Sequence, residues 1–231
     1  MDISLFLNTR NRVGLLKDLL DSIVDTTFAI NNIELLITAD DDDAETISFL
    51  QSYKDIPNLR VLISTKPSNL HSSINNMANQ CSGDFLFVLN DDVVFLTPQW
   101  DKKLLSLYSD LKNEIYYIGT QDSSIDKTHS IRYPSFPILT RKAYESLGFF
   151  MSEKFVSHGG DVHLWRIFNA IGKVVMAPIA LDHVMHNNIQ NLQLMHKDKT
   201  AQAAIKLTFS DFVDCWKEDI SEEIQALQEN A

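Results

Sequence analysis

Apolar and polar positions follow two distinct rhythms along the first ninety residues. Mostly apolar stretches predict strands over 3–7, 33–38, 59–63 and 85–89, and the last of these is an unbroken apolar run, which is typical of a strand buried on both faces. Between them apolar residues recur every three or four positions, which predicts helices over about 15–23, up to about 53, and over 70–81. This alternation predicts an α/β fold with a doubly wound, mostly parallel sheet flanked by helices.

The second half of the chain has a weaker pattern. It predicts strands over 115–118 and 174–177, and helices ending near 111, over 140–147, and beginning near 161. Thr97 is expected to cap the first of these helices, with Pro98 at the first helical position. Gly148 is expected to close the second helix. Residues 119–137 are irregular and polar, which is typical of a functional loop.

The C-terminal part has the pattern of a helical extension. Apolar residues at helical spacing over 201–216 form a stripe that can pack on the domain or on a partner, and it permits a homodimer. The last segment, 221–231, is acidic and is also expected to be helical. We therefore expect a main domain over 1–190, divided into halves at 1–96 and 97–190, followed by an extension over 191–231.

Composition narrows the class of protein. The 231 residues include 20 Lys and Arg and 31 Asp and Glu, so the net charge of −11 argues against a protein built to grip nucleic acid or an anionic membrane. Two cysteines, Cys81 and Cys215, predict free thiols in a reducing compartment. Neither a signal peptide nor a membrane span is visible in the sequence, so a cytoplasmic location is the expectation.

Polar residues follow each of the four early predicted strands, and two of these ends are strongly acidic. Residues 40–43 are four consecutive aspartates, and Asn90, Asp91 and Asp92 follow the fourth strand. The carboxyl ends of parallel strands line one crevice, where α/β sheets bind ligands. Carboxylates there suit Mg²⁺ or Mn²⁺. An acidic turn is the alternative for an Asp-Asp pair, although these carboxylates would repel one another without a cation or donors nearby.

Three further residues in the second half can carry chemistry. Asp161 lies in the first turn of a predicted helix, where a carboxylate can also serve only to complement the helix dipole. His183 and His186 follow a predicted strand, and Asp182 is available to orient one of them. A lone histidine is more often structural than a metal ligand, so the pair is the informative feature.

Several short motifs, taken in order, resemble the family-2-type, GT-A-fold glycosyltransferases over about 3–183. The resemblance rests on Thr9-Arg10-Asn11-Arg12, on Asp40, on Asn75 eight residues before Gly83, and on Asn90-Asp91-Asp92. It implies that Thr9, Arg10, Asp40, Lys66, Asn75, Asn90 and Asp91 bind the nucleotide-sugar donor, and that Asp92 binds a metal, Mn²⁺ or Mg²⁺. Asn90 departs from the family pattern because it replaces the first carboxylate of the metal motif.

The acceptor half carries matching motifs. Residues 136–142, the Gly148-Phe149 step and Gly160-Asp161 resemble the family's acceptor-side run, in which an acidic residue at a helix start is the general base of inverting enzymes. The resemblance thus implies that Asp161 is the base and that His183, with His186 as second choice, completes the metal site. Gly160 departs from the pattern, since the family often has Glu there.

The expected activity is transfer of a sugar from a nucleotide-diphosphate sugar, with UDP-sugars favoured, to a hydroxyl of a glycan or other acceptor. The resemblance makes 1–96 the nucleotide-sugar half and 97–190 the acceptor half. Three alternatives remain open. A nucleotidyltransferase would need a Gly-rich loop after its first strand, where only Gly14 is nearby. A non-catalytic nucleotide-sugar-binding relative and a scaffold protein using the C-terminal helix are the others.

Overall fold

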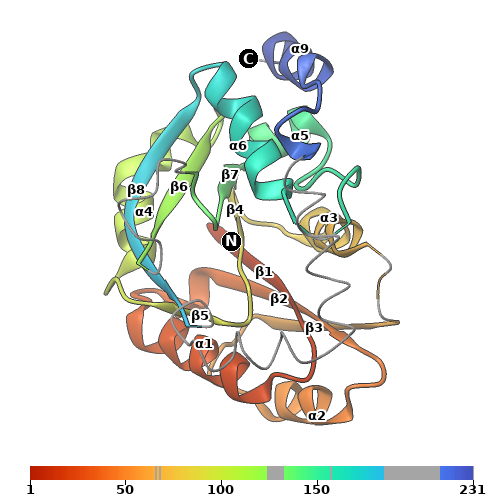
Figure 1. Cartoon of the computed structure of the whole chain (residues 1–231). Helices are drawn as coiled ribbons and strands as arrows, with labels where there is room; N and C mark the ends of the chain where they lie inside the picture. The colour runs from red at the N-terminus through yellow and green to blue at the C-terminus, as the bar shows by residue number, and fades with distance from the viewer. Residues whose placement is uncertain (66, 68, 124–132, 157, 185–213, 231) are drawn as a thin grey trace.

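The computed structural model describes residues 1–65, 67, 69–123, 133–156, 158–184 and 214–230. Within these ranges one eight-stranded sheet has the order β3-β2-β1-β4-β7-β6-β8-β5 (Figure 1). The strands are β1 (Ile3–Thr9), β2 (Ile33–Asp40), β3 (Leu59–Ser64), β4 (Phe85–Val88), β5 (Val93–Phe95), β6 (Tyr117–Asp122), β7 (Ile138–Thr140) and β8 (Val174–His183). The helices are α1 (Val13–Thr26), α2 (Ala44–Ser52), α3 (Leu70–Gln80), α4 (Trp100–Tyr108), α5 (Arg141–Leu147), α6 (Gly160–Ala170) and α9 (Ser221–Glu229).

The sheet is mostly parallel. Strands β3, β2, β1 and β4 run parallel to one another, and β6 runs parallel to β8. Strand β7 joins β4 to β6 with antiparallel pairing on both sides, and β5 pairs antiparallel with β8. The prediction of a mostly parallel α/β sheet flanked by helices is therefore confirmed. Both predicted halves of the main domain contribute strands to this one sheet.

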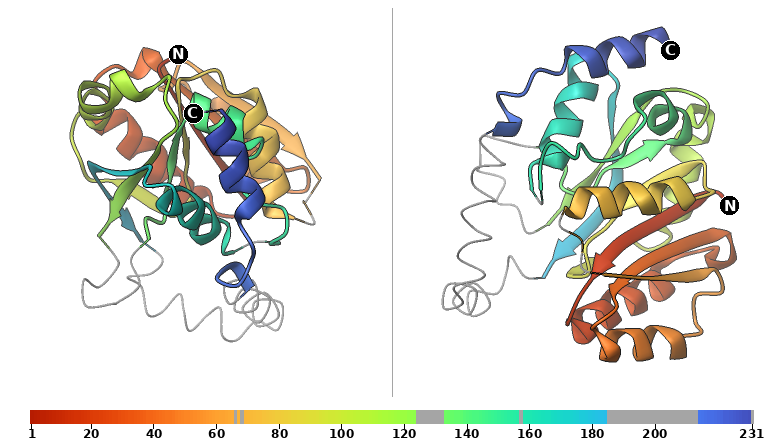
Figure 2. Two further views of the ribbon diagram at one scale, coloured as in Figure 1. Left: turned by 90° about the horizontal axis from the view of Figure 1, so that it is seen from above. Right: turned by 90° about the vertical axis from the view of Figure 1, so that its right-hand side faces the viewer.

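Alternate residues of the central strands belong to two separate cores. In β1, Leu5 and Leu7 pack into the core that includes α1 and α4, whereas Phe6 packs into the core of α3, α5 and α6. The views of Figure 2 show α1 and α2 on one side of the first strands and α3 on the other. Each fully buried Leu or Phe contributes roughly 1.5–3 kcal/mol. The mostly apolar sequences of β1, β2 and β4 reflect this burial on both faces.

The second half differs from its prediction in several places. Strand β8 continues to His183 rather than ending at 177, and β6 continues to Asp122 rather than ending at 118. Strands β5 and β7 were not predicted, and each is only three residues long.

The predicted Thr97 cap is wrong. Helix α4 begins at Trp100, and the Thr97 hydroxyl instead accepts a hydrogen bond from the backbone N–H of Ala180, at 2.8 Å, which ties the end of β5 to β8. Pro98 accordingly lies before the helix rather than at its first position. By contrast, Gly148 closes α5 in the left-handed conformation (φ 81°), as predicted.

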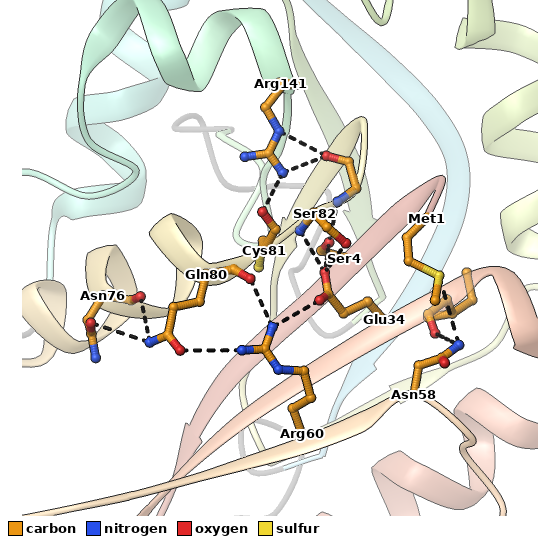
Figure 3. Close-up of polar contacts among 12 residues, drawn as sticks. Met1, Ser4, Glu34, Asn58, Arg60, Asn76, Gln80, Cys81, Ser82 and Arg141 are labelled. Carbon is orange, nitrogen blue, oxygen red and sulfur yellow. Dashed lines mark hydrogen bonds and ion pairs between the residues drawn. The ribbon is translucent and has the colours of Figure 1, made fainter.

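Glu34 organises the amino ends of the strands. Its buried carboxylate accepts hydrogen bonds from Ser4 Oγ at 2.6 Å and from Ser82 N at 2.8 Å, and it pairs with Arg60 at 3.1 Å. Arg60 also donates to the Gln80 carbonyl at the end of α3 (Figure 3). This network lies at the edge of the sheet opposite the acidic strand ends, so it holds β1, β2 and β3 in place away from the candidate site.

The C-terminal part is described from residue 214 onward. The predicted helix over 221–231 is confirmed as α9, which packs against α5 and α6. Most of the apolar stripe predicted over 201–216 lies outside the described residues, and so does the homodimer contact it would provide. None of the helices in the described ranges is both long and apolar enough to cross a membrane.

Candidate active site

The carboxyl ends of the parallel strands bring the predicted donor-side residues to one edge of the sheet. Thr9 ends β1, Asp40 ends β2, and Asp91 and Asp92 follow β4 by three and four residues. Because β5 pairs with β8 so that Val93 lies opposite His183, the histidine is carried to the same edge. Residues far apart in the sequence are therefore neighbours because of the strand order.

Asp91 is buried in a cluster with two donors from the β1–α1 connection. The Thr9 hydroxyl donates to its carboxylate at 2.9 Å, and the Arg12 guanidinium pairs with it at 2.9 Å. Arg12 also lies 3.6 Å from Asp92. Burial raises the pKa of Asp91, although Arg12 and Thr9 oppose that rise. Arg12 thus supplies the positive charge that two adjacent buried carboxylates require.

The aspartates after β2 are paired in the same way. Arg10 pairs with both Asp40 and Asp42, and Asp40 is buried. Asp43 has a structural role, because its carboxylate caps α2 by accepting from the Thr46 N–H at 3.2 Å. The repulsion expected in this cluster is therefore relieved by Arg10 at Asp40 and Asp42 and by backbone N–H groups at Asp43.

Asp92 and His183 form the second contact of the site. His183 Nε2 lies 3.2 Å from Asp92 Oδ1, and His183 Nδ1 lies 3.8 Å from Asp122 Oδ2. Burial by itself would lower the pKa of His183, but the two carboxylates raise it to about 9. For the Asp92 carboxyl, burial acts in the opposite direction and would raise the pKa. His183 and Arg12 outweigh burial and hold the pKa of Asp92 below its ordinary value.

The Asp92 carboxylate and the neutral form of His183 carry ligand atoms that suit a divalent cation, which would have to displace the proton of the imidazole. The Oδ1 atom of Asp92 is buried and faces the imidazole nitrogen, so one hard oxygen and one nitrogen converge. Within the described ranges no group of three or more His, Cys, Asp or Glu side chains could hold a metal. Mg²⁺ is commonly held by one or two carboxylates together with substrate phosphates, and a two-residue site meets that requirement.

Asp161 lies apart from this cluster, in the first turn of α6. Its carboxylate accepts a hydrogen bond from the Val162 N–H at 2.9 Å. Burial raises the pKa of Asp161 to about 6, against the lowering effect of its backbone hydrogen bonds. In the part of the chain that the structure describes, it makes no hydrogen bond or ion pair with the donor-side residues. A carboxylate with this pKa can accept a proton near neutral pH.

The remaining predicted residues have different surroundings. Asn90 is exposed at the strand end beside Asp91. Asn75 is buried, and its amide donates to the Met151 carbonyl at 2.8 Å and accepts from the N–H groups of Phe150 and Met151. Its side chain thus holds the 150–151 backbone. Lys66 and His186 lie outside the described residues.

Two residues of the site were not singled out from the sequence. Arg12 belongs to the quoted Thr-Arg-Asn-Arg motif, but its contact with both carboxylates depends on how β1 and β4 pair. Asp122 was not identified because the strand was expected to end at 118, which places Asp122 in the irregular polar stretch that follows. A strand continued by four residues would have placed Asp122 at the strand end.

Comparison with known proteins adds a family match. Residues 4–176 match the family model described as glycosyl transferase family 2. The chain is 25% identical over 224 residues to the O-antigen biosynthesis protein RfbC of Myxococcus xanthus, covering 80% of this chain and 17% of that protein. The chain therefore spans only about a sixth of this relative.

Solved structures show the same fold. Mannosyltransferase PcManGT from Pyrobaculum calidifontis, in complex with GDP-Man and Mn²⁺, superposes with a TM-score of 0.69 at 12% identity, covering 99% of this chain and 69% of that one. S. aureus TarS has a TM-score of 0.64 at 12% identity, covering 78% of this chain and 36% of that chain. TarS 1–349 in complex with UDP-GlcNAc has a TM-score of 0.61 at 13% identity, with coverage of 100% and 71%.

Proposed function

This chain belongs to glycosyl transferase family 2, and we propose that it transfers a sugar from a nucleotide-diphosphate sugar to an acceptor hydroxyl with inversion. The observation that carries the proposal is the run of contacts Thr9–Asp91–Arg12–Asp92–His183 at the carboxyl edge of the sheet. The carboxyl ends of the parallel strands are where open α/β sheets bind nucleotides. The bound ligands of similar folds, UDP, UDP-GlcNAc and GDP-Man, support a donor of this class.

On the donor side, buried polar groups would orient the nucleotide. Asp40 keeps its carboxylate at the end of β2 through Arg10, and Thr9 and Asp91 hold each other at the end of β1. The exposed amide of Asn90 would reach the donor from the end of β4. Lys66, which lies outside the described residues, would bind the donor phosphates. Asn75 would act indirectly, because its side chain holds the backbone at 150–151 in place. UDP-sugars are the donor that we expect first.

Asp92 and His183 would hold a Mn²⁺ or Mg²⁺ ion. When bound, such an ion neutralises the charge that develops on the departing diphosphate. Asp122 would orient the His183 ring from its other nitrogen, as carboxylates commonly do for metal-binding histidines. Arg12 would keep Asp91 and Asp92 from repelling each other whether or not the donor is present.

Asp161 would accept the proton of the acceptor hydroxyl as that oxygen attacks the sugar. Its pKa of about 6 leaves most of the carboxylate charged at neutral pH while keeping it a better base than an ordinary aspartate. A single displacement of this kind inverts the configuration at the attacked carbon. This assignment makes α6 the acceptor-side helix.

The test is a panel of UDP-, GDP-, dTDP- and CMP-sugars, each with and without Mn²⁺, measured by thermal shift and calorimetry. We expect at least one donor to raise the melting temperature, and Mn²⁺ to enlarge that shift, since a ligand of the folded state stabilises it. The Asp92→Asn variant should lose the Mn²⁺-dependent part of the shift, because it removes the charged oxygen ligand.

Asp18→Asn, which removes an exposed carboxylate on α1, is the matched control and should behave as the wild type. Release of nucleoside diphosphate from the binding donor, with a panel of hydroxyl acceptors, then separates an enzyme from a non-catalytic binder. If no donor binds under either metal condition, the proposed function is wrong.

A further inference from the structure

The start of α3 is joined to the segment that leads into α6. The Leu70 N–H donates to the Val156 carbonyl at 2.9 Å, and the Asn69 amide donates to the Glu153 carbonyl at 3.0 Å. One turn later Asn75 holds the 150–151 backbone, as described above. The start of α3 therefore holds the backbone of residues 150–156, which precede Asp161 in the chain.

His71 lies at the centre of this junction and is buried, with 3% of its surface exposed. Its Nδ1 is 2.9 Å from the Ser152 carbonyl oxygen. A carbonyl oxygen only accepts hydrogen bonds, so Nδ1 carries the proton and donates it. This bond sets the tautomer and the plane of the ring, and it directs the Cε1–Nε2 edge away from Ser152.

That edge lies against Gly160, the first residue of α6. A Cβ atom on Gly160 would stand 2.6 Å from His71 Cε1, 2.9 Å from His71 Nε2 and 2.9 Å from Met151 Sδ. Distances under 3.0 Å leave no room for a side chain, so the imidazole fills the space that a residue other than glycine would need. Gly160 directly precedes Asp161, and the ring therefore packs on the backbone that presents the carboxylate.

We propose that His71 is a positioning residue for the reaction: its imidazole, braced on Ser152, holds the first turn of α6 and so the Asp161 carboxylate in the orientation that accepts the acceptor proton. The inference rests on the proposed function. Reacting groups displaced by about 1 Å can lose about 100-fold in rate, so packing behind the base has a measurable effect on turnover.

The test is a double-mutant cycle on His71→Ala and Gly160→Ala, read as kcat, donor affinity and pH profile. Each single variant should lower kcat by about 10–100-fold with donor affinity within about twofold of wild type, because the donor site is a separate cluster. In the double variant the new Cβ enters the space that the imidazole left, so the combined loss should be smaller than the product of the two.

Two additional variants separate positioning from general loss of packing. His71→Asn keeps an N–H that can reach the Ser152 carbonyl and should recover part of the lost kcat. Met77→Ala removes a fully buried side chain from the same helix, and Met77 is not among the atoms nearest to a Cβ at Gly160. Its loss should combine with Gly160→Ala without coupling. His71→Ala should also admit water to Asp161 and move the acid limb of the pH profile to lower pH.

The outcomes distinguish the two proposals. An active wild type whose folded His71→Ala variant keeps full kcat, or whose two losses simply multiply, overturns this inference alone. A wild-type protein that transfers no sugar from any donor overturns the proposed function and this inference with it.

Discussion

Two opposing effects act on the negative charge of the Asp161 carboxylate. It lies in the first turn of α6, where backbone N–H groups stabilise a carboxylate, yet burial outweighs them and raises its pKa to about 6. A general base works only when it is deprotonated. We therefore expect kcat/KM to be level above pH 7 and to fall about tenfold per pH unit well below pH 6, in a rate profile measured over pH 4.5–8.

The Asp161→Asn variant gives this prediction its control. Without the base, turnover should fall at least about 100-fold and lose its acid limb, whereas donor affinity measured by calorimetry should stay near the wild-type value. An acid limb that persists in Asp161→Asn would assign the titration to another group. Full turnover in that variant would exclude Asp161 as the base.

Single residues also explain why the acidic strand ends are tolerated. The sequence raised the difficulty that Asp40–Asp43 and Asp91–Asp92 would repel one another, and it could not name the partners. The structure supplies Arg10 for the first group and Arg12 for the second, both from the connection after β1. Gly160, which departs from the family pattern, also has a local reason, since His71 occupies the space of its missing side chain.

At the scale of elements, Glu34 and its partners secure the amino ends of three strands. Burial would raise the pKa of Glu34, but hydrogen bonds from Ser4, Ser82 and Arg60 lower it below its ordinary value of 4.5. A carboxylate with a lowered pKa stabilises the fold above its unfolded pKa, and that stability is lost as pH falls through the folded pKa. We expect Glu34→Gln to cost about 1–3 kcal/mol at pH 7 in denaturant unfolding.

The cost should shrink as pH falls below about 4.5, because the unfolded chain then binds a proton at Glu34 that the folded protein binds only at lower pH. Asp84→Asn is the matched control: Asp84 pairs with Lys112 at 3.1 Å, but the two side chains are 39% and 46% exposed, so its cost should be at most about 1 kcal/mol. Equal costs for the two variants, or a Glu34→Gln cost that does not change with pH, would contradict the assigned role of the buried carboxylate.

The same scale shows what the sequence could and could not predict. Strands β1, β2 and β4 were predicted because burial on both faces gives them mostly apolar sequences. Strand β3 was also predicted from its apolar residues, although it is only partly buried. Strands β5 and β7 are three residues long, which is too short for any period to show. Strand β8 was cut short at Pro178, a residue that lacks an N–H. Its register against β6 shifts between Met176 and Ala180, so Pro178 falls where no regular ladder bond is needed.

For the candidate site, the sequence indicated which residues lie together. It did not indicate the contacts that they make with one another. Thr9, Asp91, Asp92 and His183 were named from strand ends and from the family resemblance, and the structure brings them into contact. Asp122 depended on the true end of β6. The engagement of Asn75 with the 150–151 backbone depended on packing between α3 and a distant segment, which no local pattern contains.

At the scale of the whole molecule, the described part of the C-terminal segment packs on α5 and α6. Helix α9 packs on α5 and α6 in the views of Figures 1 and 2, and Leu227 is fully buried in the core that α6 shares. Arg166 of α6 donates to the carbonyl of Cys215, and both of its Nη atoms donate to the carbonyl of Glu218, at 3.1 and 3.2 Å. The last described residues are therefore anchored to the helix that carries Asp161.

Arg166 should consequently matter more than other charges at this junction. Arg166→Ala leaves two backbone carbonyls without their charged donor, so we expect a loss of about 2 kcal/mol and a melting temperature lower by about 4–8 °C in thermal unfolding. Hydrogen exchange at residues 214–229 should rise in the same variant, since the segment loses its anchor to α6.

Lys154→Ala is the control for charge at the same junction. Lys154 pairs with Glu218 at 2.5 Å and lies 3.6 Å from Glu223, but its side chain is half exposed, so its removal should cost no more than about 1 kcal/mol. If both variants lower the melting temperature equally, charge rather than the carbonyl contacts anchors the segment. If Arg166→Ala changes neither stability nor exchange, the C-terminal segment is held by its apolar contacts alone, through Leu227 and the Trp165–Trp216 ring pair.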